Sequence, residues 1–139
     1  MHEYFIIDQN IKEEIQMKSI AILTLLGFLT LITGCNSKVN EYYVSPSGDD
    51  SAPGTSPEKA WKTIEKVNET ILKPGEKILF EGGETFTGAL KFDIEDSGTP
   101  ESPVTISSYG EGRATISSGN ETGLFAKNVS GFIVRELNF

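Results

Sequence analysis

The chain has 139 residues, of which twelve are Lys or Arg and twenty are Asp or Glu, so its formal net charge is −8. Binding to nucleic-acid phosphates needs clustered cations, and an acidic chain of this kind is therefore not expected to bind DNA or RNA. A hydrophobic content of 37% is too high for a disordered chain. The single Cys and the single His, His2, exclude an intrachain disulfide framework, a thiolate zinc site and most histidine-based catalysis.

The most apolar stretch of the chain runs from Ser19 to Gly34 and carries no charge. It follows Lys18 and is shorter than the roughly 20 residues that a membrane-spanning helix needs. A basic residue in front and small residues at the end are the layout of a secretory signal. The alternative is a transmembrane anchor followed by an ordinary cysteine. In either case residues 19–35 are predicted to attach the protein to a membrane.

The last four residues of this region, Ile32-Thr33-Gly34-Cys35, resemble the lipobox of bacterial lipoproteins. The resemblance implies cleavage between Gly34 and Cys35, a diacylglycerol on the Cys35 thiol and, usually, acylation of the new amine. Two or more acyl chains give stable anchoring. The lipobox resemblance also implies that the protein lies in the bacterial cell envelope, lipid-anchored to a membrane and facing the periplasm or the cell exterior.

Residues 1–16 carry four acids against Lys12 alone, whereas a signal peptide begins with a positive segment. Met17-Lys18 begins a normal signal by itself. We therefore predict an over-extended start at 1–16, with an unusual but genuine leader as the alternative. The predicted organisation continues with the signal peptide at 17–34, a lipidated tether at 35–41 and a folded domain at 42–139.

Glycine and proline punctuate the second part of the chain, since residues 36–139 hold twelve of the fourteen Gly and all six Pro. That density predicts many short elements. Strands are predicted at 42–44, 77–81, 85–92, 104–109, 114–116, 124–126 and 132–134, with a corner at 135–136 before Leu137 and Phe139 continue the inward-facing pattern.

A single amphipathic helix is predicted between the first two strands. Ser56 and Pro57 suit its N-cap and first position, and Pro74-Gly75 ends it. Its apolar positions recur at helical spacing: Trp61, Ile64, Val67 and Ile71. Thr63 suits the cap of a second helical start, which would break the helix after Trp61.

Short strands with one helix leave two architectures open, a β-sandwich or jelly roll and a β-solenoid. Alternation of apolar and polar residues does not separate them, because both show it. The choice between them has to come from more specific segments.

Those segments are YYVSPSGDD, PGTSPEKAWKTIEKVN, LKPGEKILFEGGETFTG, SGTPESPVTISSYGEGRATI and NVSGFIVRELNF, in that order. Together they resemble the N-terminal cap of right-handed parallel β-helix proteins of the pectate-lyase-like superfamily. The most specific parts are Pro74-Gly75 before Ile78-Leu79-Phe80, and Pro103-Val104-Thr105-Ile106 leading to Tyr109-Gly110. The resemblance covers nearly all of residues 42–139 and implies an all-β, right-handed parallel β-helix with an N-terminal capping helix.

The superfamily contains polysaccharide lyases, polygalacturonases and epimerases together with non-catalytic adhesins. Phe139 lies in an apolar run without a polar cap after it, and solenoids need capped terminal repeats. We therefore expect the front of a longer protein, cut off after about two coils, with a small protein that pairs this edge with a partner chain as the alternative.

The expected function is that of a lipid-anchored enzyme that degrades an acidic polysaccharide, as a lyase or glycoside hydrolase, with this segment inactive by itself. A non-catalytic β-helix adhesin or glycan-binding scaffold is the main alternative. A complete small jelly-roll binding module is a third reading.

No catalytic motif of the superfamily is matched, so no catalytic residue is assigned. In its lyases a Lys or Arg on a later coil removes a proton, and calcium or a basic residue neutralises the adjacent carboxylate. The resemblance thus allows calcium in the full-length protein, without a site in this segment. Arg113, Lys127 and Arg135 are available cations, and a solvated position is expected for each.

Other candidate residues also have a structural explanation. Asp49-Asp50 lack the spacing of a calcium loop and suit loop capping. Trp61 could stack on sugars, but its helical spacing with Ile64 favours a core anchor. A carboxylate pair for glycoside hydrolysis could come from Asp93, Glu95 and Asp96, with Asp93 and Glu95 on one strand face, but a solvated loop edge is favoured.

Overall fold

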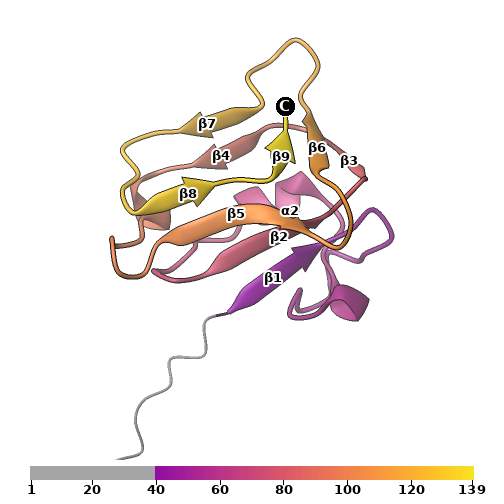
Figure 1. Ribbon diagram of the computed structural model, residues 1–139, viewed down its shortest axis with the longest axis horizontal. Helices are drawn as coiled ribbons and strands as arrows, with labels where there is room; N and C mark the ends of the chain where they lie inside the picture. Colours follow the sequence, from indigo (N-terminus) through magenta and orange to yellow (C-terminus); the bar gives the residue numbers. More distant parts are fainter. Residues whose placement is uncertain (1–39) are drawn as a thin grey trace, which may run out of the picture. The chain divides into compact units, whose positions relative to one another are not determined.

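The structure is a computed structural model that describes residues 40–139, and the strands of this region dominate it (Figure 1). The predicted start, signal peptide and Gly34–Cys35 cleavage and lipidation site lie outside the described residues. Within the described part, no helix is long and apolar enough to cross a membrane.

Within residues 40–139, nine short strands form three sheets in which every pair is parallel. The first sheet contains β1 (Glu41–Val44), β2 (Lys77–Glu81), β5 (Val104–Tyr109) and β8 (Phe132–Val134), which lie one above another in Figure 1. The second contains β3 (Thr85–Thr87), β6 (Ala114–Ser117) and β9 (Leu137–Asn138), and the third contains β4 (Leu90–Phe92) and β7 (Leu124–Ala126). Parallel pairing excludes the jelly roll, whose strands run antiparallel.

Each pass of the chain visits the three sheets in the same order. The first pass runs β2, β3, β4, the second β5, β6, β7, and the third begins with β8 and β9. The parallel register places like residues above one another, so that Ile78, Ile106 and Val134 form an inward column. Similar columns join Phe86 to Ile116 and Leu90 to Leu124. The core therefore lies between the three sheets, as the alternating pattern predicts.

The stretch at 85–92 was predicted as one strand, and this prediction is wrong. Gly88 has a φ of 128°, a conformation that an L side chain rarely adopts, and it separates β3 from β4. The chain thus turns a corner between two sheets where the sequence suggests continuous alternation. Phe86 and Leu90 are both buried, on either side of that corner.

The helical region is shorter than predicted and is broken where Thr63 suggests. A 3₁₀ turn, η1 (Pro57–Lys59), precedes the helix α2 (Ile64–Asn68), and Thr63 Oγ1 accepts a hydrogen bond from the Lys66 N–H at 3.2 Å. The helix ends at Asn68 and not at Pro74-Gly75. Ile71 consequently lies in a loop and is exposed, against the prediction, while its neighbour Leu72 is buried in the core.

The outer edge of β1 is covered by the loop that leads into α2. The Tyr43 N–H donates to Gly54 O at 2.7 Å, and the Trp61 N–H donates to Tyr43 O at 2.8 Å. Ser45 N–H in turn donates to Trp61 O at 2.9 Å. Gly54, at a φ of 73°, lies against the indole, and a Cβ there would come within 2.5 Å of the ring. An irregular loop thus supplies the hydrogen bonds of a neighbouring strand.

The third pass confirms the predicted corner after Val134. Glu136 has a φ of 55°, in the left-handed region, and it turns the chain from β8 into β9. Leu137 is buried, as predicted. Phe139 is exposed, however, so the prediction of an inward position is wrong for this residue.

Candidate functional site

A pocket of about 400 Å³ lies beside the third sheet. Three segments line it: the end of α2 with the loop after it (Asn68, Thr70, Ile71), β4 with the turn after it (Lys91, Phe92, Asp93, Glu95, Asp96), and β7 with the next residue (Phe125, Lys127). This size falls within the range of about 300 to 1,000 Å³ that small-molecule sites occupy. The pocket brings together Lys127 with the acidic group at 93–96, which the sequence analysis had considered separately.

Asn68 fixes the wall formed by β4. Its Nδ2 donates to Ala89 O at 2.9 Å, and its Oδ1 accepts from the Lys91 N–H at 2.9 Å. One side-chain amide therefore pairs with β4 as a neighbouring strand would, and it ties the end of α2 to the third sheet. This pairing fixes the backbone of Lys91, which lines the pocket.

The acidic residues after β4 form a capped turn, not a strand face. They build the short 3₁₀ helix η2 (Ile94–Asp96), in which Asp93 accepts from the Glu95 N–H at 2.8 Å and Asp96 accepts from the Asp93 N–H at 3.0 Å. Asp96 is buried and also accepts from the Leu72 N–H at 3.0 Å. Asp93 and Glu95 are exposed in this turn, which confirms the favoured loop edge for these two residues, and the alternative of a shared strand face is not formed because the chain leaves the sheet at Asp93.

These contacts determine what the carboxylates can do. A glycosidase needs two carboxyl groups facing one bond, one of them free to exchange a proton. Asp93 and Asp96 instead hold backbone N–H groups of their own turn, and Glu95 is exposed. The arrangement supports a wall of the pocket and gives no catalytic pair.

Phe125 and Lys91 form the outward-facing floor of the pocket. They are register partners in adjacent parallel strands, so their side chains leave the sheet on the same face. The Phe125 side chain is 56% exposed, while Leu90 and Phe92 on the other face of β4 are buried. Beyond Phe125, the Lys127 N–H donates to Phe92 O at 3.0 Å, which continues the pairing of the two strands.

Phe125, Lys91 and Asn68 line the pocket but were not predicted as site residues from the sequence. Phe125 left a readable signal, because it is an aromatic residue at the outward position of an alternating strand, between Leu124 and Ala126. Asn68 left none, since its partners Ala89 and Lys91 lie more than twenty residues away in sequence.

Asp50 is a structural cap, as the sequence suggests. Its Oδ1 accepts from the N–H groups of Lys62 and Thr63, and its Oδ2 accepts from the Thr63 hydroxyl at 2.7 Å. Partial burial acts to raise its pKa, but these hydrogen bonds outweigh it and lower the pKa below the usual value. Asp49 accepts from the N–H and the hydroxyl of Ser51. Because both Asp50 oxygens and Asp49 Oδ1 already accept hydrogen bonds, this pair does not fit a calcium ion.

Trp61 anchors the core, as predicted, but it does so from outside the helix, since it lies between η1 and α2 and pairs with Val44 in an isolated parallel bridge. It is 4% exposed, stacks on Tyr42 with ring centroids 4.7 Å apart, and donates from Nε1 to Ala52 O at 3.0 Å. A buried indole offers no face to a sugar. The interpretation as a stacking platform therefore does not hold in the described structure.

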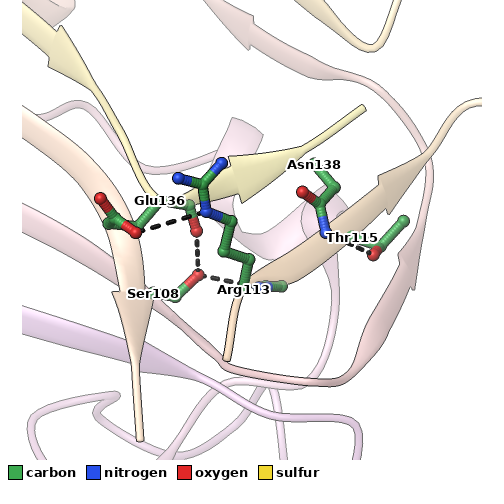
Figure 2. Close-up of polar contacts among 6 residues, drawn as sticks. Ser108, Arg113, Thr115, Glu136 and Asn138 are labelled. Carbon is green, nitrogen blue, oxygen red and sulfur yellow. Dashed lines mark hydrogen bonds and ion pairs between the residues drawn. The ribbon is translucent and has the colours of Figure 1, made fainter. Parts of the chain in front are cut away.

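Arg113 lies at the corner where the second and third passes meet (Figure 2). Its Nε is 3.4 Å from Glu136 Oε2, and both side chains are more than half exposed. Beside this pair, the Ser108 hydroxyl donates to Glu136 O at 2.6 Å and accepts from the Ala114 N–H at 2.9 Å. Arg135 is exposed as well. Arg113, Lys127 and Arg135 thus lie at the surface, as predicted, and only Lys127 lines the pocket described above.

No protein-family model matches the chain. A lacto-N-biosidase of Bifidobacterium longum subsp. longum is 39% identical over 88 residues, which are 59% of this chain and 6% of that enzyme. An alpha-1,3-galactosidase A of Akkermansia muciniphila is 32% identical over 66 residues, 47% of this chain and 11% of the relative.

Among solved structures, the crystal structure of the GH136 lacto-N-biosidase from Eubacterium ramulus superimposes with a TM-score of 0.59 at 25% identity. The match covers 70% of this chain and 20% of that one. The chain thus spans only a small part of each relative. It is mostly β with parallel sheets, like this neighbour, and it is similar to segments of enzymes named for cleaving glycans.

Proposed function

We propose that this chain is the amino-terminal part of a lipid-anchored, extracytoplasmic glycoside hydrolase, in which the three parallel sheets are the first coils of a right-handed β-helix. The observation that carries the proposal is the 39% identity to a lacto-N-biosidase over 88 residues. The structural match to a second lacto-N-biosidase and the repeated order of sheets support it. The substrate is a galactose-containing glycan, since both named activities of the relatives concern such sugars.

The comparisons favour hydrolysis over the lyase reaction that the sequence analysis kept open. Both relatives are named as glycosidases. The acidic balance of residues 36–139, ten cations against sixteen anions, also suits a neutral glycan better than a polyuronate. We therefore propose a neutral glycan as the substrate, with an acidic glycan as the alternative.

This segment contributes the covered end of the β-helix, and bond cleavage belongs to other coils. The loop at 46–63 closes the edge of β1, and α2 closes the edge of β4 through Asn68. The carboxylates at 93 and 96 are engaged in their turn, so no residue of this segment is assigned to catalysis.

The test is to express the reading frame that encodes this chain up to its own stop codon. Its product is assayed for release of lacto-N-biose from lacto-N-biose-terminated oligosaccharides and of galactose from α-1,3-linked galactosides. Release of either sugar supports the proposal. A stop codon directly after Phe139, or a long product that binds these glycans without cleaving them, would overturn the hydrolase and leave a glycan-binding scaffold.

The lipid anchor is tested separately. In a bacterial host the chain is expected to incorporate labelled palmitate and to be recovered with membranes. The variant C35S is expected to lose the label, while C35S and the native chain keep the same fold of residues 40–139 by circular dichroism of the purified proteins. Labelling that persists in C35S would contradict lipidation at this residue.

A further inference from the structure

Exposed apolar side chains gather in the pocket beside the third sheet. Among the described residues, the large exposed apolar side chains are Ile71, Ile94, Phe125, Ile133 and Phe139. Ile71 and Phe125, at 60% and 56% exposure, line the same pocket. Apolar surface left in water is unfavourable by about 25 cal/mol per Å². A ligand with an apolar face that covers Phe125 and Ile71 would recover part of this free energy.

The lining of the same pocket also carries unpaired charges of both signs. Lys91 and Lys127 lie within 4 Å of no carboxylate of residues 40–139, and Glu95 is likewise unpaired within this range. Ammonium groups only donate hydrogen bonds and carboxylates only accept them. This lining suits a ligand whose groups do both. The whole pocket sets Lys91 and Lys127 against three acids, Asp93, Glu95 and Asp96, and this small excess of negative charge disfavours an anionic ligand.

The pocket is also built before any ligand arrives. Asn68 holds β4 through two hydrogen bonds, and the buried Asp96 ties η2 to Leu72. Register pairing fixes Phe125 beside Lys91. A preformed pocket saves the ordering cost that a flexible loop would incur on binding.

We propose that this pocket is a non-catalytic binding site for one neutral hexopyranose ring of a glycan. The C–H face of the ring packs on Phe125 and Ile71, and its hydroxyls bond to Lys91, Lys127 and Glu95. The ligand class rests on the proposed function, because it takes a glycan as the molecule that the full protein meets. The site would hold a glycan chain near the protein while another part of the same protein cleaves it.

The experiment titrates the full chain, labelled with nitrogen-15, with three probes and follows its amide resonances. The probes are D-galactose, D-galacturonate, and mannitol, which has hydroxyls but no ring face. Galactose is expected to shift resonances around residues 91 and 125–127. Mannitol is expected to give no such shifts, and galacturonate is expected to bind more weakly than galactose because of the carboxylates at 93, 95 and 96.

Variants locate the site. F125A is expected to weaken galactose binding about tenfold, and F125W to retain it, since an aromatic face carries the contact. I133A removes an exposed apolar side chain of similar exposure from the first sheet and is expected to leave binding unchanged. K91A is the second pocket variant, and its weaker binding would support the site even if F125A lowered the folded fraction.

Three results would overturn the inference: no binding of galactose, equal binding by F125A and the native chain when both are folded, or tighter binding of galacturonate. These outcomes are separable from the fate of the proposed function. Cleavage of galactosides by the full reading frame, together with unaltered binding by F125A, would remove the pocket site and leave the hydrolase standing.

Discussion

The three parallel sheets form a stack of strands, and the outer strand edges at its two ends differ in how they are covered. At the first end, the loop at 46–63 makes two backbone hydrogen bonds with Tyr43 of β1 and a third with Ser45 just after the strand, and the Asn68 amide pairs with β4. At the other end, the outer edges of β7, β8 and β9 have no strand partner among residues 40–139. A parallel sheet edge can therefore be closed without a strand, provided that donors and acceptors are held at strand spacing.

At the covered end, formed by the loop at 46–63 and α2, a few side chains hold these backbone donors and acceptors in position. Trp61 packs under the loop, Asp50 ties the loop to the start of α2, and Asn68 ties the end of α2 to β4. In the middle of the stack, by contrast, each strand has a neighbouring strand on both sides, so the stabilising contacts are distributed over many residues. Single substitutions should therefore lower the free energy of unfolding most at the covered end.

The largest effect is expected for W61A. Removing a buried indole leaves a cavity and should lower the free energy of unfolding by about 3–5 kcal/mol. F132A, at the open end, removes a half-buried ring that lies 4.9 Å from Phe92, and about 1 kcal/mol is expected. Urea unfolding of the full chain followed by far-ultraviolet circular dichroism measures both.

A W61F variant is the control for the indole N–H, whose bond to Ala52 O should contribute about 1 kcal/mol. Equal losses in W61A and F132A would show that the covered end is no more sensitive than the open one. That result would contradict the comparison.

The next effect concerns Asp50 and depends on pH. D50A removes the acceptor of three hydrogen bonds and should cost about 2 kcal/mol at neutral pH. Because the folded pKa of Asp50 lies below the unfolded value of about 3.9, its stabilisation is present above that value and is lost as pH falls through the folded pKa. The difference between the native chain and D50A should therefore shrink on acidification below about pH 4.

Unfolding midpoints in urea across this pH range measure the difference. D49A is the matched control, since its carboxylate meets only Ser51, and a smaller and less pH-dependent loss is expected. A gap between the native chain and D50A that stays constant down to low pH would argue that the carboxylate charge has no part in holding the loop.

The fold could be predicted from the sequence where local chemistry and packing agree. The strand at 77–81 and the inward positions of Val104, Ile106 and Ala114 follow from alternation, and the Thr63 cap follows from its side chain. The break between β3 and β4 at Gly88 could not be predicted from this alternation. A glycine within an alternating run fits a strand or a corner equally well, and only the neighbouring sheets decide between them.

The candidate site was less accessible to sequence reasoning. Its floor joins Lys91 and Phe125, which become neighbours only through the parallel register of β4 and β7. Ile71 is predicted to be a core residue from its helical spacing, yet the helix ends at Asn68 and Ile71 lies exposed in the loop after it. The last residue of the helix, Asn68, pairs with Ala89 and Lys91, more than twenty residues away, and a contact of this kind cannot be predicted from a local sequence pattern.

A smaller effect is expected from Asn68. N68D keeps the oxygen that accepts from Lys91 N–H but lacks the donor to Ala89 O, so about 1 kcal/mol should be lost. N68A lacks both groups and should lose about 2 kcal/mol. The measurement is urea unfolding together with amide hydrogen exchange of Lys91, which should speed up in N68A more than in N68D. Unchanged exchange in both would show that the amide does not stand in for a strand.

The smallest expected effect lies at the open end and has the opposite sign. Glu136 adopts a left-handed conformation, which costs an ordinary residue about 1–2 kcal/mol, whereas Asn tolerates it better. E136N also removes the exposed pair with Arg113, which contributes at most about 1 kcal/mol. R113Q measures that pair alone, since the Ser108 bond goes to the backbone of Glu136 and survives both changes. After subtraction of the R113Q effect, E136N should stabilise the chain by about 0.5 kcal/mol, as measured by urea unfolding. A net loss of stability would mean that the glutamate side chain, and not its backbone, holds the corner.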